Sequence, residues 1–153
     1  MKRIAHYALS IAMLGLALYA APAASDPGED SARQAVTAFL KAIATKNVDA
    51  ILKTTDAPFL TDGLILLKTK DQVRKYLNDE IASAPANEMA DSILGVIPYE
   101  KSREITDPRM LKERDKVLKN GDYLVGIGRN QLSRGWLLVK VRGGRAAIVG
   151  IGI

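Results

Sequence analysis

The chain has 153 residues, a formal net charge of +5 and no cysteine, and its single histidine is His6. Without cysteine it can form neither a disulfide nor a thiolate metal site, and it cannot be a lipoprotein anchored through cysteine. Histidine and cysteine supply the usual general base, the commonest zinc ligands and the activated thiol nucleophile. If His6 is removed with a leader, the remaining chain lacks most of the standard catalytic groups.

The N-terminal segment has the three parts of a secretory signal. Lys2 and Arg3 precede an apolar run over residues 8–21, and Ala21-Pro22-Ala23 follows. Because small side chains at positions 21 and 23 fit the subsites of a signal peptidase, we expect a signal peptide over residues 1–23, cleaved near Ala23. The mature protein would then be exported, to the periplasm or the extracellular space. An uncleaved anchor is the alternative, because the apolar stretch approaches the roughly 18 residues that cross a bilayer. Membrane contact is expected only through this segment.

Residues 24–30 contain Pro27 and Gly28 and show no apolar period, so a flexible leader is predicted there. Residues 31–153 are long enough to form a single domain with its own hydrophobic core. Charge is unevenly distributed, because residues 24–100 hold 8 basic and 12 acidic side chains whereas residues 101–153 hold 12 basic and 5 acidic ones. Removal of the signal would leave a net charge of +3.

The first half of this domain begins with two predicted helices. Ser31 and Gln34 form a capping-box pattern at the start of the first helix. Its apolar face has helical spacing: Ala32, Ala35, Val36, Phe39, Leu40 and Ile43. Asn47 can cap a second, short helix, which Asp56-Ala57-Pro58 would end.

A small hairpin and a third helix are predicted next. The hairpin covers residues 59–67, with its turn at Thr61-Asp62-Gly63. Thr69 and Gln72 form a second capping box, which opens a helix that stops before Pro85. The inner face of this helix is expected to consist of Val73, Tyr76, Leu77 and Ile81.

The second half predicts strands around one further helix. A strand is expected over Ile93–Tyr99, and Asp107-Pro108 has the cap and first-turn proline that begin a helix. Asn120-Gly121 would end that helix. The last three strands are predicted at Tyr123–Arg129, Trp136–Arg142 and Arg145–Ile151.

The final two strands meet at Gly143-Gly144, a two-residue turn of the kind that closes a tight hairpin. This turn predicts four pairs: Arg142 with Arg145, Lys140 with Ala147, Leu138 with Val149, and Trp136 with Ile151. One face would carry Trp136, Leu138, Val149 and Ile151, and the other Leu137, Val139, Val141 and Ile148. Both faces are apolar, so each must be covered. The N-terminal helices can cover one, and the other needs the helix from Asp107 or a second copy of the protein.

The order of these elements resembles the nuclear transport factor 2-like superfamily, which includes SnoaL-like and ketosteroid-isomerase-like proteins. The matching segments are Phe39-Leu40-Lys41-Ala42-Ile43, the run from Lys46 to Leu52, the third-helix entry from Thr69 to Leu77, and Gly135-Trp136 in a late strand. The resemblance covers nearly the whole mature chain. Its motifs are apolar and helix-start patterns, which specify an architecture far better than an activity.

The resemblance implies an α+β fold in which a cone-shaped, curved antiparallel sheet wraps around three N-terminal helices. It also implies a pocket at the open end of the cone and, often, a homodimer formed through the outer sheet face. The extra helix before the last three strands departs from the family pattern. Catalytic members of the family usually place an acid, and often a histidine, in the pocket to move a proton.

Four residues could take part in proton transfer of the isomerase type, which needs only a carboxylate base and a tyrosine or protonated acid beside the oxyanion. They are Asp56, Tyr76, Tyr99 and Tyr123. Each also has a structural interpretation, since Asp56 can act as a local cap and a tyrosine ring can pack in a core while its hydroxyl finds one partner. Trp136 could floor a ligand pocket, lie at a dimer contact, or pack in the core. We name these five as candidate ligand-binding residues and assign no catalytic residue.

No cofactor or metal is predicted. Gly126-Ile127-Gly128 and Gly150-Ile151-Gly152 lack the third glycine and the following helix of a dinucleotide fingerprint, and sheet curvature explains them better. The acidic residues lack the spacing of a calcium loop. The basic half could attract an anionic partner or form a solvated face, and nucleic acid is not expected for an exported chain.

Three hypotheses about function follow. The first is an exported, non-enzymatic module that binds a small, partly apolar or anionic ligand between the helices and the sheet. It is motivated by the missing catalytic groups and by the two apolar faces of the last hairpin. The second is a proton-transfer enzyme, an isomerase or dehydratase type that uses a buried carboxylate and a tyrosine. The third is a structural or interaction protein that acts through the outer sheet face.

Overall fold

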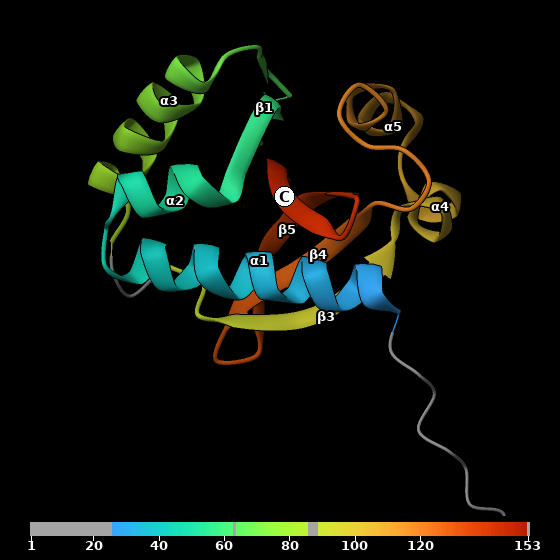
Figure 1. Cartoon of the computed structure of the whole chain (residues 1–153), viewed down its shortest axis with the longest axis horizontal. Coiled ribbons are helices and arrows are strands. Elements are labelled where there is room, and N and C mark those ends of the chain that lie inside the picture. Colours follow the sequence, from blue (N-terminus) through green and yellow to red (C-terminus); the bar gives the residue numbers. More distant parts are fainter. Residues whose placement is uncertain (1–25, 63, 86–88, 153) are drawn as a thin grey trace, which may run out of the picture.

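The computed structural model describes residues 26–62, 64–85 and 89–152 (Figure 1). The expected signal peptide and its cleavage site lie outside these residues. The described elements, in chain order, are α1 (Pro27–Ala44), α2 (Val48–Thr54), β1 (Thr55–Leu60), β2 (Leu66–Leu67), α3 (Lys70–Ser83), β3 (Ser92–Pro98), α4 (Tyr99–Ser102), the 3-10 helix η1 (Arg103–Ile105), α5 (Pro108–Arg114), β4 (Tyr123–Arg129), β5 (Leu132–Arg142) and β6 (Arg145–Gly152). Within the described part, no helix is both long and apolar enough to cross a membrane.

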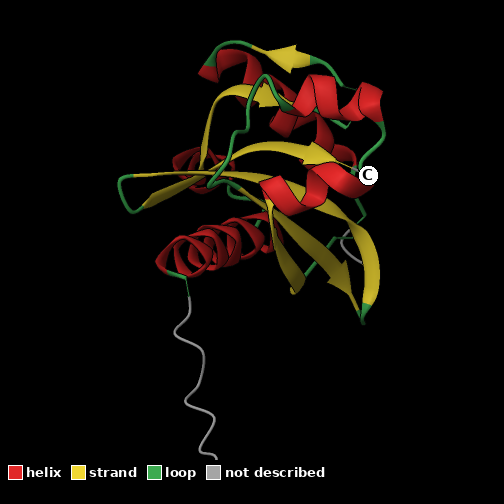
Figure 2. Cartoon of the chain, turned by 90° about the vertical axis from the view of Figure 1, so that its right-hand side faces the viewer, coloured by secondary structure: helices red, strands yellow, loops and turns green. Residues whose placement is uncertain are grey.

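The six strands form one curved sheet in the order β2-β1-β6-β5-β4-β3 (Figure 2). All neighbours are antiparallel except β1 and β6, which run parallel. Helices α1, α2 and α3 pack against one face of this sheet and form a shared core with it. This arrangement confirms the predicted α+β fold, in which a curved sheet packs against three N-terminal helices, although the parallel pair of β1 and β6 departs from the expected antiparallel sheet. The expected early helices, small hairpin and long late strands all occur in the predicted order.

Helix α1 begins at Pro27, earlier than the predicted start at Ser31. Asp26 caps it by accepting the N–H of Gly28 at 2.9 Å. Proline is favourable in the first turn, and the carboxylates of Glu29 and Asp30 complement the positive end of the helix dipole. Residues 27–30 are therefore helical, and the prediction of a flexible leader there is wrong.

The other early elements agree more closely with the sequence. Asn47 caps α2 by accepting the N–H of Ala50 at 3.0 Å. Both halves of the capping box of Thr69 and Gln72 are present at the start of α3. The predicted hairpin forms with Phe59 paired to Leu67, although its first strand begins at Thr55 and includes the residues expected only to end α2.

The last hairpin contains a β-bulge that the sequence does not reveal. The pairs Arg142–Arg145 and Lys140–Ala147 are as predicted, but Val139 pairs with Ile148 while Leu138 pairs with Gly150. Val149 is thus an extra residue, and the predicted pairs of Leu138 with Val149 and Trp136 with Ile151 are wrong by one position. A bulge shifts the strand relative to its neighbour, so Ile151 lies opposite Leu137 and packs with the inner core.

The outer face of the sheet is covered by the chain's own segment between β3 and β4. Its buried cluster consists of Leu60, Tyr99, Val117, Leu118, Leu124, Leu138 and Val149, with Leu66, Leu111 and Trp136 partly buried against it. Figures 1 and 2 show α4 and α5 on the side of the strands opposite α1. The sequence left two alternatives for covering this face, the helix from Asp107 or a second copy of the protein. The segment that contains this helix covers it. The homodimer stays a prediction.

Two boundaries in this outer segment differ from prediction. Tyr99 begins α4 instead of ending the strand β3, because its N–H donates to the backbone oxygen of Asp122 at 2.7 Å and its ring is fully buried. Helix α5 ends at Arg114, before the predicted end at Asn120-Gly121. Past Arg114 the backbone forms tight turns, in which the N–H groups of Val117 and Leu118 both donate to its carbonyl oxygen. These turns direct both side chains onto the sheet.

Candidate functional site

A cavity of about 210 Å³ opens between the helical layer and the inner face of the sheet. We call it the inner cavity. Its walls come from α1, from α3 and the residues after it, and from β4, β5 and β6: Phe39, Leu40, Ile43, Leu77, Glu80, Ile81, Ala84, Met89, Ala90, Ile127, Arg134, Leu137 and Ile151. The apolar faces of α1 and α3, which the sequence predicts, thus form most of one side. The bulge in β6 adds Ile151 to the other.

Among the described residues, the inner cavity is lined by apolar side chains in its depth and by charged side chains at only two exposed positions. Phe39, Leu77 and Leu137 are at most 2% exposed. The two charged lining residues, Glu80 and Arg134, are both exposed. No described tyrosine or aspartate lines this cavity. The walls can therefore hold an apolar molecule, and the two exposed charges can contact a polar end.

The three candidate tyrosines each donate their hydroxyl to a carboxylate away from the inner cavity. Tyr99 donates to Asp115 Oδ1 at 2.8 Å, Tyr76 donates to Asp62 Oδ1 at 3.3 Å, and Tyr123 donates to Asp26 Oδ2. A hydroxyl held in this way is not free to stabilise an oxyanion unless its bond to the carboxylate breaks.

Burial raises the pKa of all three tyrosines, and the neighbouring carboxylates raise it further. For Tyr123, burial and the hydrogen bond to Asp26 raise the pKa to about 12. For Tyr99 and Tyr76 the pKa is raised by burial first and then by Asp115 and Asp62 respectively. Each ring is therefore a neutral donor at physiological pH, and each has a structural partner.

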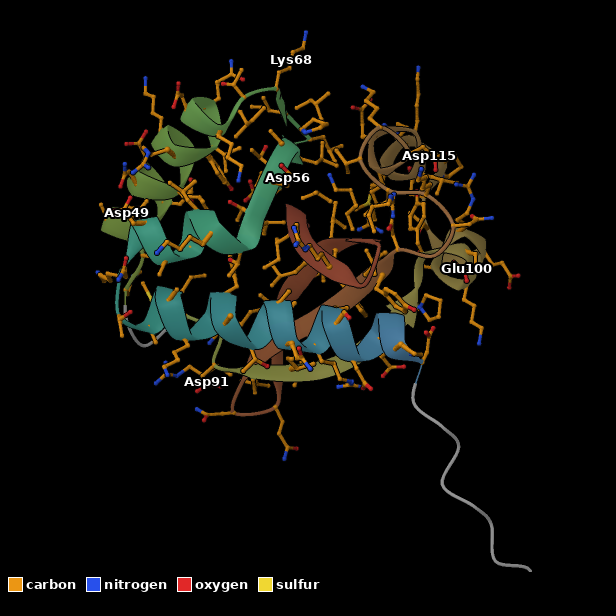
Figure 3. The ribbon with its side chains drawn as sticks, viewed as in Figure 1. Asp49, Asp56, Lys68, Asp91, Glu100 and Asp115 are labelled. Atoms are coloured by element: carbon orange, nitrogen blue, oxygen red, sulfur yellow. The ribbon has the colours of Figure 1, made fainter. Side chains whose placement is uncertain are left out.

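Asp56 lies on β1, well apart from Asp115 (Figure 3). It accepts a hydrogen bond from Lys140 Nζ at 2.8 Å and from the N–H of Ala57 at 2.9 Å. Partial burial would raise the pKa of Asp56, but these bonds and the charges of Lys140 and Lys70 outweigh it and hold the pKa below the usual 3.8. A carboxylate stabilised in its ionised form is a weak general base.

Asp56 also lines a polar cleft of about 390 Å³ with a strongly basic rim. Its lining residues are Lys53, Thr55, Asp56, Lys70, Lys140, Arg142, Arg145, Ala146 and Ala147. Two of these cations are paired with acids, Lys140 with Asp56 and Arg142 with Asp122. Basic residues from both halves of the chain therefore line this cleft. Lys53 and Lys70 come from the first half, and Lys140, Arg142 and Arg145 come from the second.

Replacing Lys140 with methionine is expected to lower the free energy of unfolding by about 0.5 kcal/mol at pH 7, because the pair is partly exposed. The pKa of Asp56 is lower in the folded than in the unfolded protein, where it is 3.8. The stability that its charge contributes is therefore present above pH 3.8 and is lost as the pH falls through the pKa of the folded state. Urea unfolding at pH 7 and below pH 3 should show this difference disappearing in acid. Lys53→Met removes a charge from the same cleft without breaking that pair, so its effect should change less with pH.

Trp136 lines a third cavity, of about 200 Å³, on the opposite face of the sheet. We call it the outer cavity. It lies between the outer segment and the strands, and its walls are Ile97, Ser102, Thr106, Asp107, Met110, Arg114, Leu124 and Trp136. Sequence reasoning offered Trp136 as a pocket residue, a dimer contact or a core residue, and the structure places it half-buried at this cavity.

The five sequence candidates do not meet in one place. Asp56 lies in the basic cleft and Trp136 in the outer cavity, while none of the three tyrosines lines any of the three cavities described here. Sequence reasoning missed Arg114, Glu80 and Arg134 as cavity residues. Helical and strand periodicity identifies apolar walls, but it gives no signal for which charged residue lies beside them. Within the described part of the chain, no group of three or more acidic residues could hold a metal ion.

Comparison with models of protein families gives no match, and comparison with curated proteins gives none either. Solved structures that are similar to the chain include the following two. One is a protein of unknown function with a cystatin-like fold from Nostoc punctiforme PCC 73102, 10% identical over 82% of this chain and 88% of that chain, with a TM-score of 0.48. The other is a protein named Rd1NTF2_05 that carries five substitutions, 14% identical over 81% of this chain and 96% of that chain, with a TM-score of 0.45. Neither likeness assigns a ligand or an activity.

Proposed function

We propose that this chain is a binding module that holds a small, apolar or partly apolar molecule in the inner cavity. The observation that carries the proposal is the apolar lining of that cavity, with Phe39, Leu77 and Leu137 in its depth. Small-molecule sites are typically concave and mostly apolar, with a few polar groups that orient the ligand. Glu80 and Arg134 are the groups positioned to contact a polar end.

The size of the inner cavity suits a small ring or a short chain. Its volume of about 210 Å³ exceeds the roughly 150 Å³ of an engineered apolar cavity that accepts benzene. Transfer of such a ligand from water gains about 25 cal/mol per Å² of apolar surface that it buries. The proposal does not involve proton transfer, and the separate hydrogen-bonded positions of Asp56 and the tyrosines support binding over catalysis.

Export is part of the proposal and is supported by the signal pattern of residues 1–23. When the full chain is made in a host with a secretory pathway, the mature protein is expected to begin at Ala24. Mass spectrometry of the secreted or periplasmic fraction tests this expectation. A protein that keeps residues 1–23 and stays with the membrane would contradict it.

Indole is the probe for the inner cavity, because it is small, rigid and mostly apolar. Amide chemical shifts are expected to move on titration at residues that line this cavity, including Leu77, Ile127 and Leu137. Ala90→Leu adds a larger side chain to the wall and should weaken indole binding by about tenfold or more, equal to about 1.4 kcal/mol.

Ala82→Leu is the matched control, because Ala82 is exposed on α3 and does not line the inner cavity. This variant should bind indole as the parent protein does. Equal binding by the two leucine variants, or shifts confined to residues away from the cavity, would contradict the proposed function.

A further inference from the structure

Arg114, the last residue of α5, is a buried arginine without an acidic partner in the described part of the chain. The residue is only 5% exposed. No ion pair among residues 26–62, 64–85 and 89–152 includes it. Its one hydrogen bond to a described residue is a long contact from Nη1 to Thr106 Oγ1 at 3.4 Å. A buried charge normally requires a partner, because removing it from water costs several kcal/mol.

The guanidinium reaches from α5 toward the end of β6, beside the outer cavity. Nη2 lies 3.3 Å from the position that a Cβ on Gly152 would occupy, so the side chain crosses the sheet surface there. The outer cavity has Arg114 in its wall together with Trp136, Met110, Leu124 and Ile97. One cationic group thus borders a space of about 200 Å³, whose other walls are these four apolar side chains together with Ser102, Thr106 and Asp107.

The two hydroxyl groups that line the outer cavity already donate hydrogen bonds to backbone oxygens. Ser102 Oγ donates to the backbone oxygen of Tyr99 at 2.8 Å, and Thr106 Oγ1 donates to the backbone oxygen of Ser102 at 2.7 Å. Arginine has five N–H donors, so Arg114 is the residue with donors to offer. Burial lowers the pKa of Arg114, an effect that Tyr99 offsets only in part, but an arginine remains charged at neutral pH.

Asp107 is the other charged group in the outer cavity wall. Its carboxylate caps α5 by accepting the N–H of Arg109 at 2.8 Å, and its side chain is 52% exposed. It therefore lies at the solvent side, whereas Arg114 is buried. A negative charge at Asp107 would repel an anion held by Arg114, so its removal should not weaken anion binding.

We propose that the outer cavity is a second binding site, which takes a small carboxylate with an apolar body. Arg114 binds the carboxylate, since its planar guanidinium matches two carboxylate oxygens with two parallel N–H groups. The apolar body lies against Trp136, Met110 and Leu124. This site is on the opposite face of the sheet from the inner cavity and does not depend on it.

Cyclohexanecarboxylate is the probe, and cyclohexanemethanol is its neutral counterpart. Trp136 is the single tryptophan of the chain and lines the outer cavity, so its fluorescence reports directly on this site. The carboxylate is expected to change the emission saturably, and the alcohol is not. Inorganic phosphate, which has the charge without an apolar body, should bind at least about tenfold more weakly.

Arg114→Met should weaken the carboxylate response at least about tenfold, and Arg114→Lys, which keeps the charge but loses the planar fork, should give an intermediate loss. Lys112→Met is the matched control, because Lys112 is an exposed cation on the same helix and does not line the outer cavity, whereas the exposed Arg109 pairs with Asp107 of the cavity wall. It should leave the response unchanged. Asp107→Asn, which retains an N-capping side chain, should bind as tightly as the parent or more tightly.

Thermal unfolding separates binding from a structural role. Without ligand, Arg114→Met should have an equal or higher Tm, because it removes a buried charge that has no acidic partner among the described residues. The titrations are repeated on a chain extended by a short Gly-Ser tail, so that residue 153 carries no main-chain carboxylate. This extended chain should bind cyclohexanecarboxylate as tightly as the parent, or more tightly.

Several outcomes would overturn the proposal: no saturable response in the parent or tailed chain, equal responses to the acid and the alcohol, phosphate binding as tightly as the acid, or equal losses in Lys112→Met and Arg114→Met. A lower Tm in Arg114→Met with an unchanged response would show that Arg114 is only structural. Indole binding at the inner cavity should be unaffected by Arg114→Met, so failure of this proposal is distinguishable from failure of the first.

Discussion

Replacing Tyr99 with alanine is expected to lower the free energy of unfolding by about 3–5 kcal/mol, the range for large aromatic side chains in a core. Tyr99 is fully buried at the centre of the outer segment, and its hydroxyl donates to Asp115. The Arg103 guanidinium carbon also lies over its ring, 5.6 Å from the ring centroid. Truncation would leave a large void between the segment and the sheet, and equilibrium urea unfolding measures the loss.

Tyr99→Phe is the control, because it keeps the ring and removes only the hydroxyl. It should cost about 1 kcal/mol, the typical net value of one hydrogen bond. If Tyr99→Ala costs no more than Tyr99→Phe, the ring does not hold the outer segment on the sheet. The proposed cover of the outer face would then be wrong.

Replacing Asp122 with alanine is expected to cost about 3 kcal/mol, because it would leave several partly buried donors without an acceptor. Asp122 is fully buried, and its carboxylate accepts from Arg142 Nη2 at 2.8 Å and from the N–H groups of Lys119 at 2.8 Å and Val141 at 2.9 Å. Arg142 is partly exposed and can recover water, so the two backbone N–H groups account for most of the loss.

Asp122→Asn keeps one acceptor oxygen of similar shape and should cost less than Asp122→Ala. Hydrogen exchange offers a local readout, since the amide of Val141 should lose protection in the alanine variant before the central strands do. Equal protection at Val141 in the parent and in Asp122→Ala would be inconsistent with this role.

The sequence predicts the architecture well because apolar periodicity and helix caps are local signals. The capping box of Thr69 and Gln72 and the apolar face of α1 both occur as predicted. The two apolar faces of the last hairpin also predict correctly that both sides of the sheet are covered. The register beyond Val139 could not be predicted, because a bulge at Val149 depends on packing against neighbouring strands and leaves no mark in the alternation.

The sites were less predictable than the fold. Sequence reasoning selected tyrosines and Asp56 for their chemistry, but their partners come from distant segments, such as Asp26 for Tyr123 and Lys140 for Asp56. The sequence analysis did not assign Arg114 to any candidate site. Its burial results from the end of α5 being turned onto the sheet, and a list of residue types contains no sign of that.

Xenon binding tests the central claim most directly, because xenon fills apolar cavities and makes no hydrogen bonds. In crystals of the protein kept under xenon pressure, we expect a bound atom in the inner cavity, in contact with Phe39, Leu77 and Leu137. The same crystals of Ala90→Leu should show reduced occupancy. An inner cavity that stays free of xenon, filled by side chains or by ordered water, would contradict the account of this chain as a module that binds apolar molecules.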